Sequence, residues 1–517
     1  MKLIVPKEVS QVTETLQKGG FEAYLVGGCV RDVLMGREPK DWDVTTNATP
    51  EEIQKLFPKT FYENKYGTVG VVNEDISKEV EPSETSKKEV LAGEGGEKKS
   101  IEYLSKREAL RVVEVTPYRV ESEYSDFRHP DVVTFSKNLE DDLKRRDFTV
   151  NAIAYDPASG ILKDIYKGQK DLSDKVLRTV GSASDRFGED ALRMLRAVRF
   201  SVSLGFTISS ETSEAIIKQA ELLEKISKER IRDEFSKILM SNDPVIGIVM
   251  CQKFGLLRYI VPELEEGIGV KQNSDHIYEV WEHGLRALGH AGERKWSLEV
   301  RLAALFHDIG KPRTRGWNED KKDFTFYGHD VVGERMAKKI LERLRYSSET
   351  SDKVLKLIRN HMFFTDIDKI TLSAVRRIVR NVGKENVWDL MSVRACDRIG
   401  MGRPVETPYR LRKYESMIEE AMRAPVTVQM LKINGQRIME VTGLTPGPKI
   451  GFMLHALLEE VLDDPNLNTE EYLENKAKEF SLLSDEELKK IGESGKEKKE
   501  EAEEKELKII RKKYGVK

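Results

Sequence analysis

Two carboxylates lie one residue apart at Asp41 and Asp43, at the end of a stretch that reads LVGGCVRDVLMGREPKDWD. In a β-strand, residues i and i+2 point to the same face, so these carboxylates would converge on one point while Trp42 faces the opposite side. Such paired oxygen ligands suit Mg²⁺, which typically takes one or two carboxylates together with substrate phosphates. The alternative interpretation is a glycine turn followed by solvated charges.

Upstream of this pair, Gly27 and Gly28 leave the backbone without Cβ atoms. Backbone N–H groups at such a position can approach a triphosphate closely. The order of strand, Gly-Gly, helix and DxD therefore favours a nucleotide site over a chance cluster of charges.

A third segment, RRDFTVNA, brings phosphate-binding and ribose-binding groups together. The guanidinium groups of Arg145 and Arg146 match phosphate oxygens in a bidentate way. The carboxylate of Asp147 and the amide of Asn151 suit ribose hydroxyls. This segment therefore extends the predicted nucleotide site.

A fourth segment, RFGEDALRMLRAVRF, opens a predicted helix. Glu189 and Arg193 are spaced i, i+4, which by itself indicates an ordinary helix-stabilising pair. In the alternative, Asp190 and Arg193 present an acceptor and donors to the edge of a base, in imitation of base pairing.

A second chemical centre is predicted around the sequence LFHDIGKP. His307 and Asp308 are adjacent, His283 lies upstream and Asp397 lies downstream. Imidazole and carboxylate groups together suit a divalent transition metal that activates water. Six of the eight histidines fall in this region, which favours a metal site over a structural His-Asp pair; His276, His329 and His361 are further candidate ligands.

Composition limits the possible protein classes. A chain of 517 residues implies roughly two to four domains, and no apolar run approaches the ~20 residues of a membrane span. The N-terminus has no signal-peptide core, because Pro6 interrupts its apolar start. The three cysteines form no CxxC motif, which favours a reducing, cytoplasmic location. The net charge of −3 gives no global sign of nucleic-acid binding but leaves room for a local basic surface.

The pattern along the chain changes near residue 180. Short apolar runs at 23–26, 69–72, 112–115 and 132–135 predict strands of a mixed domain, and later residues follow a helical period almost throughout. Residues 73–107 are polar and of low complexity, so we expect an extended loop inserted between two neighbouring strands.

These motifs together resemble a known family. GGCVRD, DWD, EVTPYR, EYSDFRHP, RRDFTVNA, RFGEDALRMLRAVRF and ERIRDEFSKIL occur in the order found in class II tRNA nucleotidyltransferases, the CCA-adding and bacterial poly(A) polymerase family. The resemblance is dense from about residue 20 to 240. It resumes near the C-terminus with LKINGQRIMEVTGLTPGPKIG and LDDPNLNTEEYL. The segment around LFHDIGKP resembles the HD phosphohydrolase superfamily.

The resemblance implies an α+β protein, with a polymerase-β-like head of mixed sheet and helices followed by an all-α neck, body and tail that include an HD domain. The expected boundaries are 1–180 for the head with the insertion at 73–107, 181–245 for the neck, 246–400 for the body with the HD domain, 401–483 for the tail, and 484–517 for a charged extension.

The resemblance also implies roles for individual residues. Asp41 and Asp43 would hold Mg²⁺, and Glu114 is either a third catalytic carboxylate or a residue that orients its strand. The nucleotide-binding residues would be Gly27, Gly28, Arg31, Asp32, Arg146, Asp147, Asn151, Glu189, Asp190, Arg193, Arg196 and Arg199. A transition metal at the HD site would be held by His283, His307, Asp308 and Asp397.

The expected reaction is transfer of CMP and AMP from CTP and ATP to the 3′ end of tRNA, with release of pyrophosphate. Two rivals of the same class are an A-adding enzyme and a poly(A) polymerase. A CC-only enzyme is disfavoured, because residues 118–130 resemble the loop associated with AMP addition. A rival of another class is an HD phosphohydrolase with an RNA-binding head, which the intact DxD and EDxxR motifs disfavour.

Overall fold

The computed structural model describes most of the chain in two units. The first unit ends at Leu355 and the second begins at Lys356. The described residues are 3–62, 67–73, 110–122, 132–362, 370–422, 428, 431–488, 490–491, 504 and 507–516.

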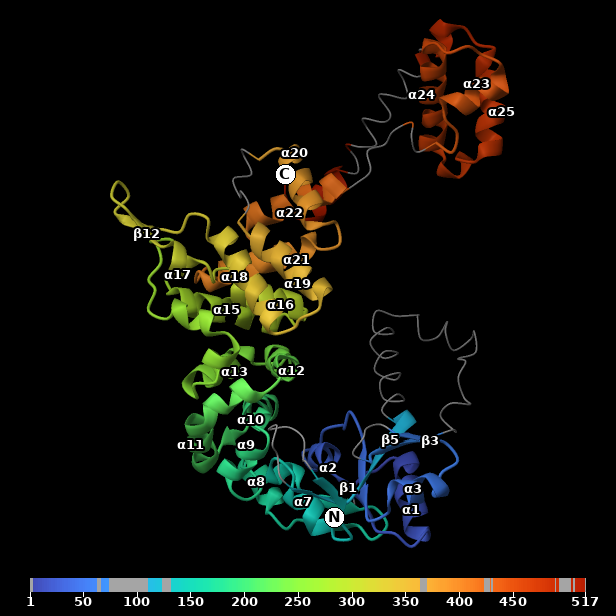
Figure 1. Ribbon diagram of the computed structural model, residues 1–517. Helices are drawn as coiled ribbons and strands as arrows, with labels where there is room; N and C mark the ends of the chain where they lie inside the picture. The colour runs from blue at the N-terminus through green and yellow to red at the C-terminus, as the bar shows by residue number, and fades with distance from the viewer. Residues whose placement is uncertain are drawn as a thin grey trace. The chain divides into compact units, whose positions relative to one another are not determined.

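A seven-stranded mixed sheet forms the head of the first unit (Figure 1). Its strand order is β3-β4-β5-β2-β1-β8-β9, in which β2 and β5 pair in parallel and the other neighbours pair antiparallel. Its strands are β1 (Ala23–Val26), β2 (Asp43–Thr46), β3 (Thr60–Tyr62), β4 (Val69–Val72), β5 (Val112–Pro117), β8 (Ala154–Asp156) and β9 (Ile161–Lys163). A separate antiparallel pair is made by β6 (Arg119–Ser122) and β7 (Val132–Phe135).

Residue alternation along the strands builds a core on each face of this sheet. Leu25 and Tyr155 belong to the cluster that also holds residues of α1 (Lys7–Lys18) and α3 (Pro50–Leu56). Their neighbours Val26 and Ala154 belong to a second cluster with residues of α7 (Leu139–Lys144). Because successive side chains of a strand point to opposite faces, the central strands β1 and β8 are buried on both faces of the sheet.

The predicted insertion falls between β4 and β5. These strands pair antiparallel, with Val69 opposite Val115, which confirms the prediction that its flanks are neighbouring strands. The insertion itself, apart from residue 73, lies outside the described residues. The domain boundaries expected from the sequence remain predictions.

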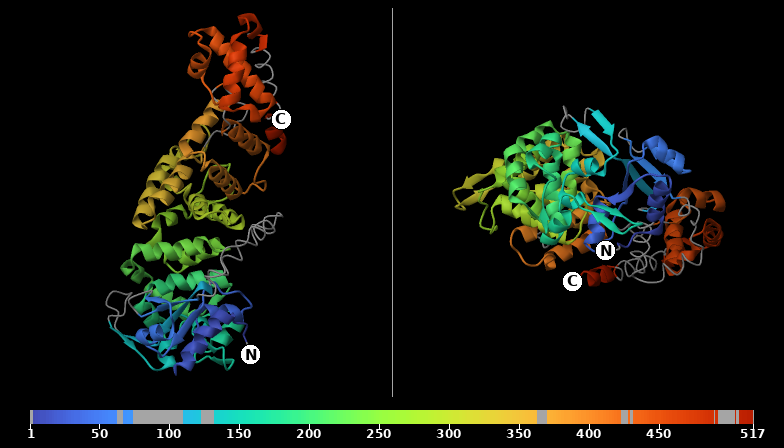
Figure 2. Two further views of the ribbon diagram at one scale, coloured as in Figure 1. Left: turned by 90° about the vertical axis from the view of Figure 1, so that its right-hand side faces the viewer. Right: turned by 90° about the horizontal axis from the view of Figure 1, so that it is seen from below.

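Helices dominate the first unit beyond residue 180, as the sequence predicts, with α10, α12 and α13 packed against one another (Figures 1 and 2). Two short strand pairs interrupt the helices: β10 (Val176–Leu177) with β11 (Thr207–Ile208), and β12 (Gly316–Asn318) with β13 (Asp323–Thr325). Two helices before residue 180 have not yet been named, α2 (Gly28–Leu34) and α8 (Gly168–Asp174). The α-helices described beyond residue 180 in this unit are α9 (Ala183–Glu189), α10 (Leu192–Leu204), α11 (Ser210–Gln219), α12 (Lys228–Leu239), α13 (Pro244–Lys253), α14 (Leu257–Ile260), α15 (Val280–Glu293), α16 (Leu298–Phe306), α17 (Lys311–Thr314), α18 (His329–Arg343) and α19 (Ser348–Asn360). The last of these, α19, spans the division between the units.

The second unit is helical in its described part. It contains one apolar cluster from α20, α21 and α22, and another from α23, α24 and α25. Among the described residues, no helix combines the length and the apolar character that a membrane crossing requires. These helices are α20 (Leu372–Val382), α21 (Val387–Gly400), α22 (Tyr409–Met422), α23 (Gly435–Thr442), α24 (Pro448–Asp463) and α25 (Glu470–Ser481).

Candidate functional site

Asp43 begins β2 and points to the face of the sheet that α7 covers. Its neighbours Trp42 and Val44 are buried in the cluster under α1 and α3. Thr45, which shares the face of Asp43, donates a hydrogen bond to Asp142 of α7 at 3.1 Å. Trp42 therefore faces away from Asp43, as the sequence pattern predicts. Asp41 is exposed and precedes the strand, so the strand period fixes the direction of Asp43 alone.

Glu114 lies next to Asp43 in the sheet. The two residues are register partners in the parallel pair of β2 and β5, and both are half-buried. Aligned residues of neighbouring strands project to the same face. The structure thus brings Asp43 and Glu114 together, in agreement with either role predicted for Glu114.

Gly27 adjoins this carboxylate pair in a conformation that requires glycine. Its φ is +83°, and a Cβ atom there would lie 3.1 Å from Arg146 Nη1 and 3.4 Å from Asp43 Oδ2. Arg146 Nε is buried and has no hydrogen-bond partner among the described residues. A guanidinium group and a carboxylate oxygen therefore flank bare backbone, which fits an anionic ligand held together with a divalent cation.

Cys29 lies beneath this surface and takes no part in its chemistry. Its Sγ donates to the carbonyl of Val26 at 3.3 Å and contacts the carbonyl of Asp43 at 3.8 Å. Burial, reinforced by the charge of Asp43, raises the pKa of the Cys29 thiol to about 12. The thiol therefore stays protonated and unreactive at neutral pH.

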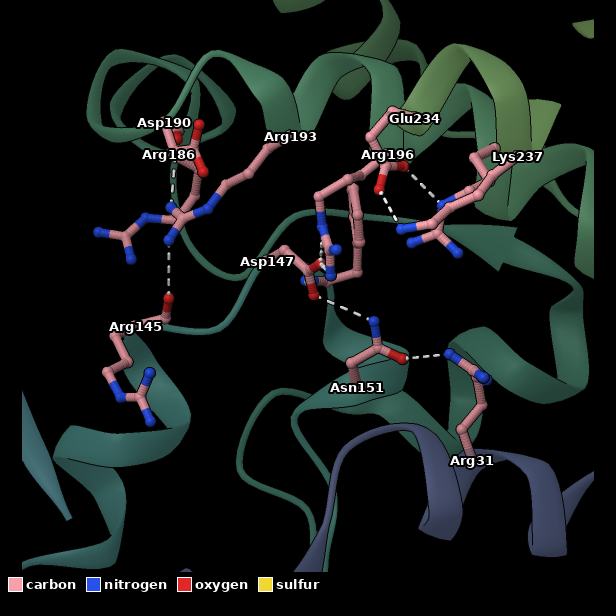
Figure 3. Close-up of polar contacts among 12 residues, drawn as sticks. Arg31, Arg145, Asp147, Asn151, Arg186, Asp190, Arg193, Arg196, Glu234 and Lys237 are labelled. Atoms are coloured by element: carbon pink, nitrogen blue, oxygen red, sulfur yellow. Dashed lines mark hydrogen bonds and ion pairs between the residues drawn. The ribbon is translucent and has the colours of Figure 1, made fainter. Parts of the chain in front are cut away.

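A chain of hydrogen bonds runs from α2 to α10 through the RRDFTVNA segment (Figure 3). Arg31 Nη1 donates to Asn151 Oδ1 at 2.7 Å, and Asn151 Nδ2 donates to Asp147 Oδ1 at 3.0 Å. Arg196 donates to Asp147 Oδ2 through Nε at 2.9 Å and through Nη2 at 2.6 Å. These hydrogen bonds connect α2 to α10. They also engage the side chains of Asp147 and Asn151, which the sequence predicts as ribose ligands.

The charge of Asp147 depends on this arrangement. Burial by itself would raise its pKa, but the charge of Arg196 and the hydrogen bonds from Asn151 and Arg196 lower it from the usual 3.8 to about 2. Asp147 is therefore ionised at neutral pH and holds both partners in place.

Asp142 of α7 orients the two arginines that follow it. Its Oδ1 accepts from Arg145 Nε and Nη2 at 2.9 and 2.6 Å, and its Oδ2 accepts from Arg146 Nη2 at 3.1 Å. Burial opposes the ionised form, yet these arginines bring the pKa of Asp142 below its usual value. A buried carboxylate thus fixes the direction of the guanidinium of Arg146, which the sequence predicts as a phosphate ligand.

The predicted base-selecting residues lie where α9 gives way to α10. Arg193 Nη1 donates to Glu189 Oε2 at 2.6 Å, which is the i, i+4 pair expected of a plain helix, and Glu189 also contacts Arg186. Asp190 accepts a bidentate pair from Arg230 of α12, at 3.1 and 2.7 Å. Arg230 was not identified from the sequence, although it stands in the ERIRDEFSKIL motif.

Three arginines surround one aromatic ring behind these residues. The guanidinium carbons of Arg199, Arg31 and Arg196 lie 4.1, 5.3 and 5.3 Å from the ring centre of Phe200. Arg199 Nε also donates to buried Glu234 of α12 at 2.6 Å. Cation–π contacts of this kind hold guanidinium groups whose charges would otherwise repel one another.

The second predicted centre lies in α15, α16 and the following turn. His283 Nε2 lies 2.9 Å from His307 Nε2 and 3.0 Å from Asp308 Oδ2. Asp308 Oδ1 lies 3.3 Å from His329 Nε2. All four side chains are buried, so the structure brings together three imidazoles and one carboxylate, a set suited to a divalent transition metal.

Backbone carbonyls orient the imidazoles of this cluster. His307 Nδ1 lies 2.8 Å from the carbonyl of Ala304, and His329 Nδ1 lies 2.7 Å from the carbonyl of Phe326. A ring held through Nδ1 by a backbone carbonyl leaves Nε2 on the side of Asp308, and this second contact is typical of histidines that bind a metal through Nε2. His276 packs edge-on against His283, with ring centres 5.1 Å apart.

Lys311 is a buried member of the cluster that was not identified from the sequence. Its Nζ lies 2.6 Å from Asp308 Oδ2 and donates to Gln272 Oε1 at 2.7 Å. Burial opposes ionisation of Asp308, but His307 and Lys311 hold its pKa well below the usual range. The two remaining sequence-predicted groups, Asp397 and His361, are buried in the second unit; Asp397 pairs there with Arg394, and its place in the metal set remains a prediction.

Three known protein families match successive parts of the chain. Residues 23–89 and 71–178 match the family described as the poly A polymerase head domain. Residues 205–268 match the probable RNA and SrmB-binding site of polymerase A, and residues 273–401 match the HD domain. The chain is 32% identical over 468 residues to the CCA-adding enzyme of Lactococcus lactis subsp. lactis, covering 89% of this chain and 94% of that protein.

The chain belongs to the CCA-adding enzyme family. An A-adding tRNA nucleotidyltransferase of Deinococcus radiodurans is also similar, with 36% identity over 340 residues, 64% of this chain and 76% of that protein. The crystal structure of the Bacillus stearothermophilus CCA-adding enzyme in complex with CTP has a TM-score of 0.56 and 27% identity, over 92% of this chain and 98% of that chain.

Family membership confirms the resemblance and the fold class predicted from the sequence. The chain is a nucleotidyltransferase with a mixed-sheet head and an HD domain. A nucleotidyltransferase head implies dependence on a divalent metal ion.

Proposed function

We propose that this chain extends the 3′ end of tRNA with CMP and AMP, taking them from CTP and ATP without a nucleic-acid template and releasing pyrophosphate. The observation that carries the proposal is the bare backbone at Gly27 between Asp43 Oδ2 and Arg146 Nη1. A metal-binding carboxylate and a phosphate-binding guanidinium flank a surface on which no side chain stands. The names of the relatives and the CTP complex of the Bacillus stearothermophilus enzyme support the same activity.

The catalytic part of the proposal places Mg²⁺ on Asp41 and Asp43. These carboxylates would hold the ion, which would supply a Lewis acid for the tRNA 3′-hydroxyl and for the charge of the leaving pyrophosphate. Glu114 either adds a third carboxylate or orients Asp43 through the strand pairing. Gly27 and Gly28 give the triphosphate access to the backbone, where no Cβ keeps it away.

The triphosphate is bound by arginines that carboxylates already orient. Arg146 is directed by Asp142, and Arg31 is held by Asp32 at 2.8 Å and by Asn151. Because these guanidinium groups are positioned before the ligand arrives, less side-chain entropy is lost on binding. Asp147 and Asn151 already bond to each other, to Arg196 and to Arg31. They contact the ribose only through donor or acceptor positions that these hydrogen bonds do not use.

Base selection is assigned to Glu189, Asp190 and Arg193, with Arg196 and Arg199 completing the basic face of α10. Asp190 and Arg193 read a base only when they give up or share their present contacts with Arg230 and Glu189. A base that satisfies these groups is favoured over one that leaves them unpaired, because an unpaired buried polar group is costly.

Incorporation of single labelled nucleotides tests the proposal. Three tRNA substrates are used, ending in the discriminator base, in C and in CC, each with CTP, ATP, UTP or GTP. The proposed enzyme adds CMP to the first two and AMP to the third. An A-adding enzyme, the activity named for the Deinococcus radiodurans relative, acts on the CC end alone. A poly(A) polymerase adds runs of AMP to all three ends.

A second activity is proposed for the HD cluster, namely metal-dependent hydrolysis of phosphate esters. The observation that favours it is the convergence of His283, His307 and His329 on Asp308 in a buried position. These residues would hold a transition metal, which would supply an activated water for attack on phosphorus. The test is hydrolysis of p-nitrophenyl phosphate esters and 2′,3′-cyclic nucleotides with Ni²⁺, Mn²⁺, Co²⁺ and Mg²⁺. Absence of hydrolysis with every metal would mean that the cluster has only a structural role.

A cytoplasmic location remains a prediction from the cysteine content.

A further inference from the structure

Lys311 fills the polar centre of the HD cluster with a positive charge. Its Nζ lies 2.6 Å from Asp308 Oδ2, the same oxygen that faces His283 Nε2 at 3.0 Å and His307 Nε2 at 3.3 Å. The side chain is 7% exposed, so solvent contributes little to its stabilisation. A divalent metal held by these three groups would share its carboxylate oxygen with an ammonium group, and the two positive charges would repel each other.

The geometry points to a dual role for Lys311: it neutralises Asp308 while the metal is absent, and it becomes the phosphate ligand of the site once a metal displaces it. This inference rests on the metal site of the proposed HD activity. It goes beyond that activity by naming the residue that binds the phosphate oxygens of the substrate.

The side chain of Lys311 can move whereas its backbone cannot. A Cβ atom on the preceding Gly310 would lie 2.3 Å from the carbonyl oxygen of His329 and 2.6 Å from the nitrogen of Gly333, so the chain is tightly packed there. The lysine stem has four rotatable carbons. The change of partner is therefore confined to the ammonium end.

A second acceptor is available to Lys311 when it leaves Asp308. Gln272 Oε1 lies 2.7 Å from Nζ, and Gln272 is itself fixed by donating through Nε2 to the carbonyl of Tyr278 at 3.0 Å. The ammonium group thus remains beside the metal, where a buried positive charge requires an anion. A phosphate oxygen between metal and ammonium meets this need, and lysine is a frequent phosphate ligand.

Metal titration of the full-length chain tests the inference. The parent carries Asp41→Asn and Asp43→Asn, so that the head does not contribute a metal site. Mn²⁺ affinity is measured by titration calorimetry and by electron paramagnetic resonance of free Mn²⁺, alone and with sub-millimolar inorganic phosphate or adenosine 3′-monophosphate. Lys311→Met is compared with Lys339→Met, a matched change at an exposed position of α18.

In the parent and in Lys339→Met, we expect either phosphate compound to raise Mn²⁺ affinity by about fivefold or more, the low end of typical coupling between two ligands. In Lys311→Met, Mn²⁺ alone binds at least about threefold more tightly, because the competing cation is gone, and the phosphate effect disappears. An effect with the nucleotide alone also supports the inference and identifies the nucleoside as part of the ligand.

Equal metal affinity and equal phosphate effects in Lys311→Met and Lys339→Met would overturn the inference and make Lys311 a structural partner of Asp308. Lys311→Gln, which removes the charge but keeps a donor toward Gln272, must behave as Lys311→Met does, so a folding defect in one variant does not decide the result. Failure of His307→Ala to weaken Mn²⁺ binding in the parent would instead contradict the metal site itself.

Discussion

The predicted nucleotide site of the head and the HD cluster differ in the side chains that surround their carboxylates. Around the predicted nucleotide site, arginines pair with carboxylates: Arg31 with Asp32, Arg146 with Asp142, and Arg196 with Asp147. In the HD cluster, three imidazoles and one ammonium group surround the carboxylate of Asp308. The head thus offers oriented guanidinium groups to a polyanion, and the cluster offers imidazole nitrogens to a metal.

This difference shows how one chain could carry two separate reactions of phosphate compounds, nucleotide transfer in the head and ester hydrolysis at the HD cluster. Guanidinium groups stay charged at any physiological pH and bind phosphate oxygens directly, whereas imidazole nitrogens bind a transition metal that in turn binds the phosphate. Mg²⁺ prefers oxygen ligands, so it favours Asp41 and Asp43 over the histidines. The two sites should therefore respond differently to mutation and to metal.

The largest expected effect is loss of transfer on removal of a head carboxylate. Asp41→Asn or Asp43→Asn should lower CMP and AMP incorporation by about 10²- to 10³-fold, the range found when one electrostatic group of a catalytic site is removed. Binding of tRNA should persist, because phosphate contacts elsewhere are untouched. Asp174→Asn, an exposed carboxylate of α8, serves as the control. Substantial transfer by both variants would show that the catalytic pair lies elsewhere.

A smaller effect is expected on stability when Asp147 is neutralised. Its pKa is lowered from 3.8 to about 2 in the folded protein, so its ionised form stabilises the fold by about 2 kcal/mol. Because the folded pKa is depressed, this contribution is present above pH 4 and is lost as the pH falls toward 2.

Urea unfolding of wild type and Asp147→Asn between pH 7 and pH 2.5 measures this contribution. The difference in unfolding free energy should be largest at pH 7 and should shrink as the pH falls. A difference that does not depend on pH would mean that Asp147 acts through packing alone.

The effect on base choice should be about tenfold. Asp190→Ala and Arg193→Ala should lower the preference for CTP and ATP over UTP and GTP more than they weaken triphosphate binding, because hydrogen bonds to a base edge carry specificity. Arg230→Met should act in the same direction, since it removes the bidentate contact that holds Asp190 in position. Arg232→Met on the same helix is the matched control. Unchanged selection in all three variants would remove these residues from base recognition.

The smallest effect is expected from deletion of residues 79–97, which lie outside the described residues. Their polar composition offers little apolar surface to bury, and shortening a loop by half changes its closure entropy by less than about 1 kcal/mol. Melting temperature and CCA addition should both stay near the values of the full chain. A large loss of activity would indicate that this insertion contacts tRNA.

The head could be predicted from the sequence because its signals are local. Residue alternation places Trp42 and Val44 in the core, so Asp43 faces the other way, and two glycines mark the bare backbone beside it. The strand pairing of β4 with β5 followed from apolar runs on either side of a polar insertion.

Contacts between distant residues could not be predicted in the same way. Arg31 bonds Asn151, 120 positions away, and Asp190 bonds Arg230, 40 positions away. No periodicity of one segment reveals such partners, because they depend on how α2, α10 and α12 pack. Lys311 was a different case: it stands three residues after Asp308 at the start of a helix, and that i, i+3 spacing was a signal available in the sequence.

The central claim is that nucleotide transfer does not depend on the HD cluster, and His307→Ala combined with Asp308→Ala tests it most directly. Transfer of CMP and AMP to tRNA is measured in Mg²⁺, beside phosphate-ester hydrolysis in Ni²⁺, for this variant and for wild type, with near-ultraviolet circular dichroism to verify the fold. We predict transfer at the wild-type rate and no hydrolysis. Loss of transfer in a variant that keeps the wild-type fold would contradict the claim.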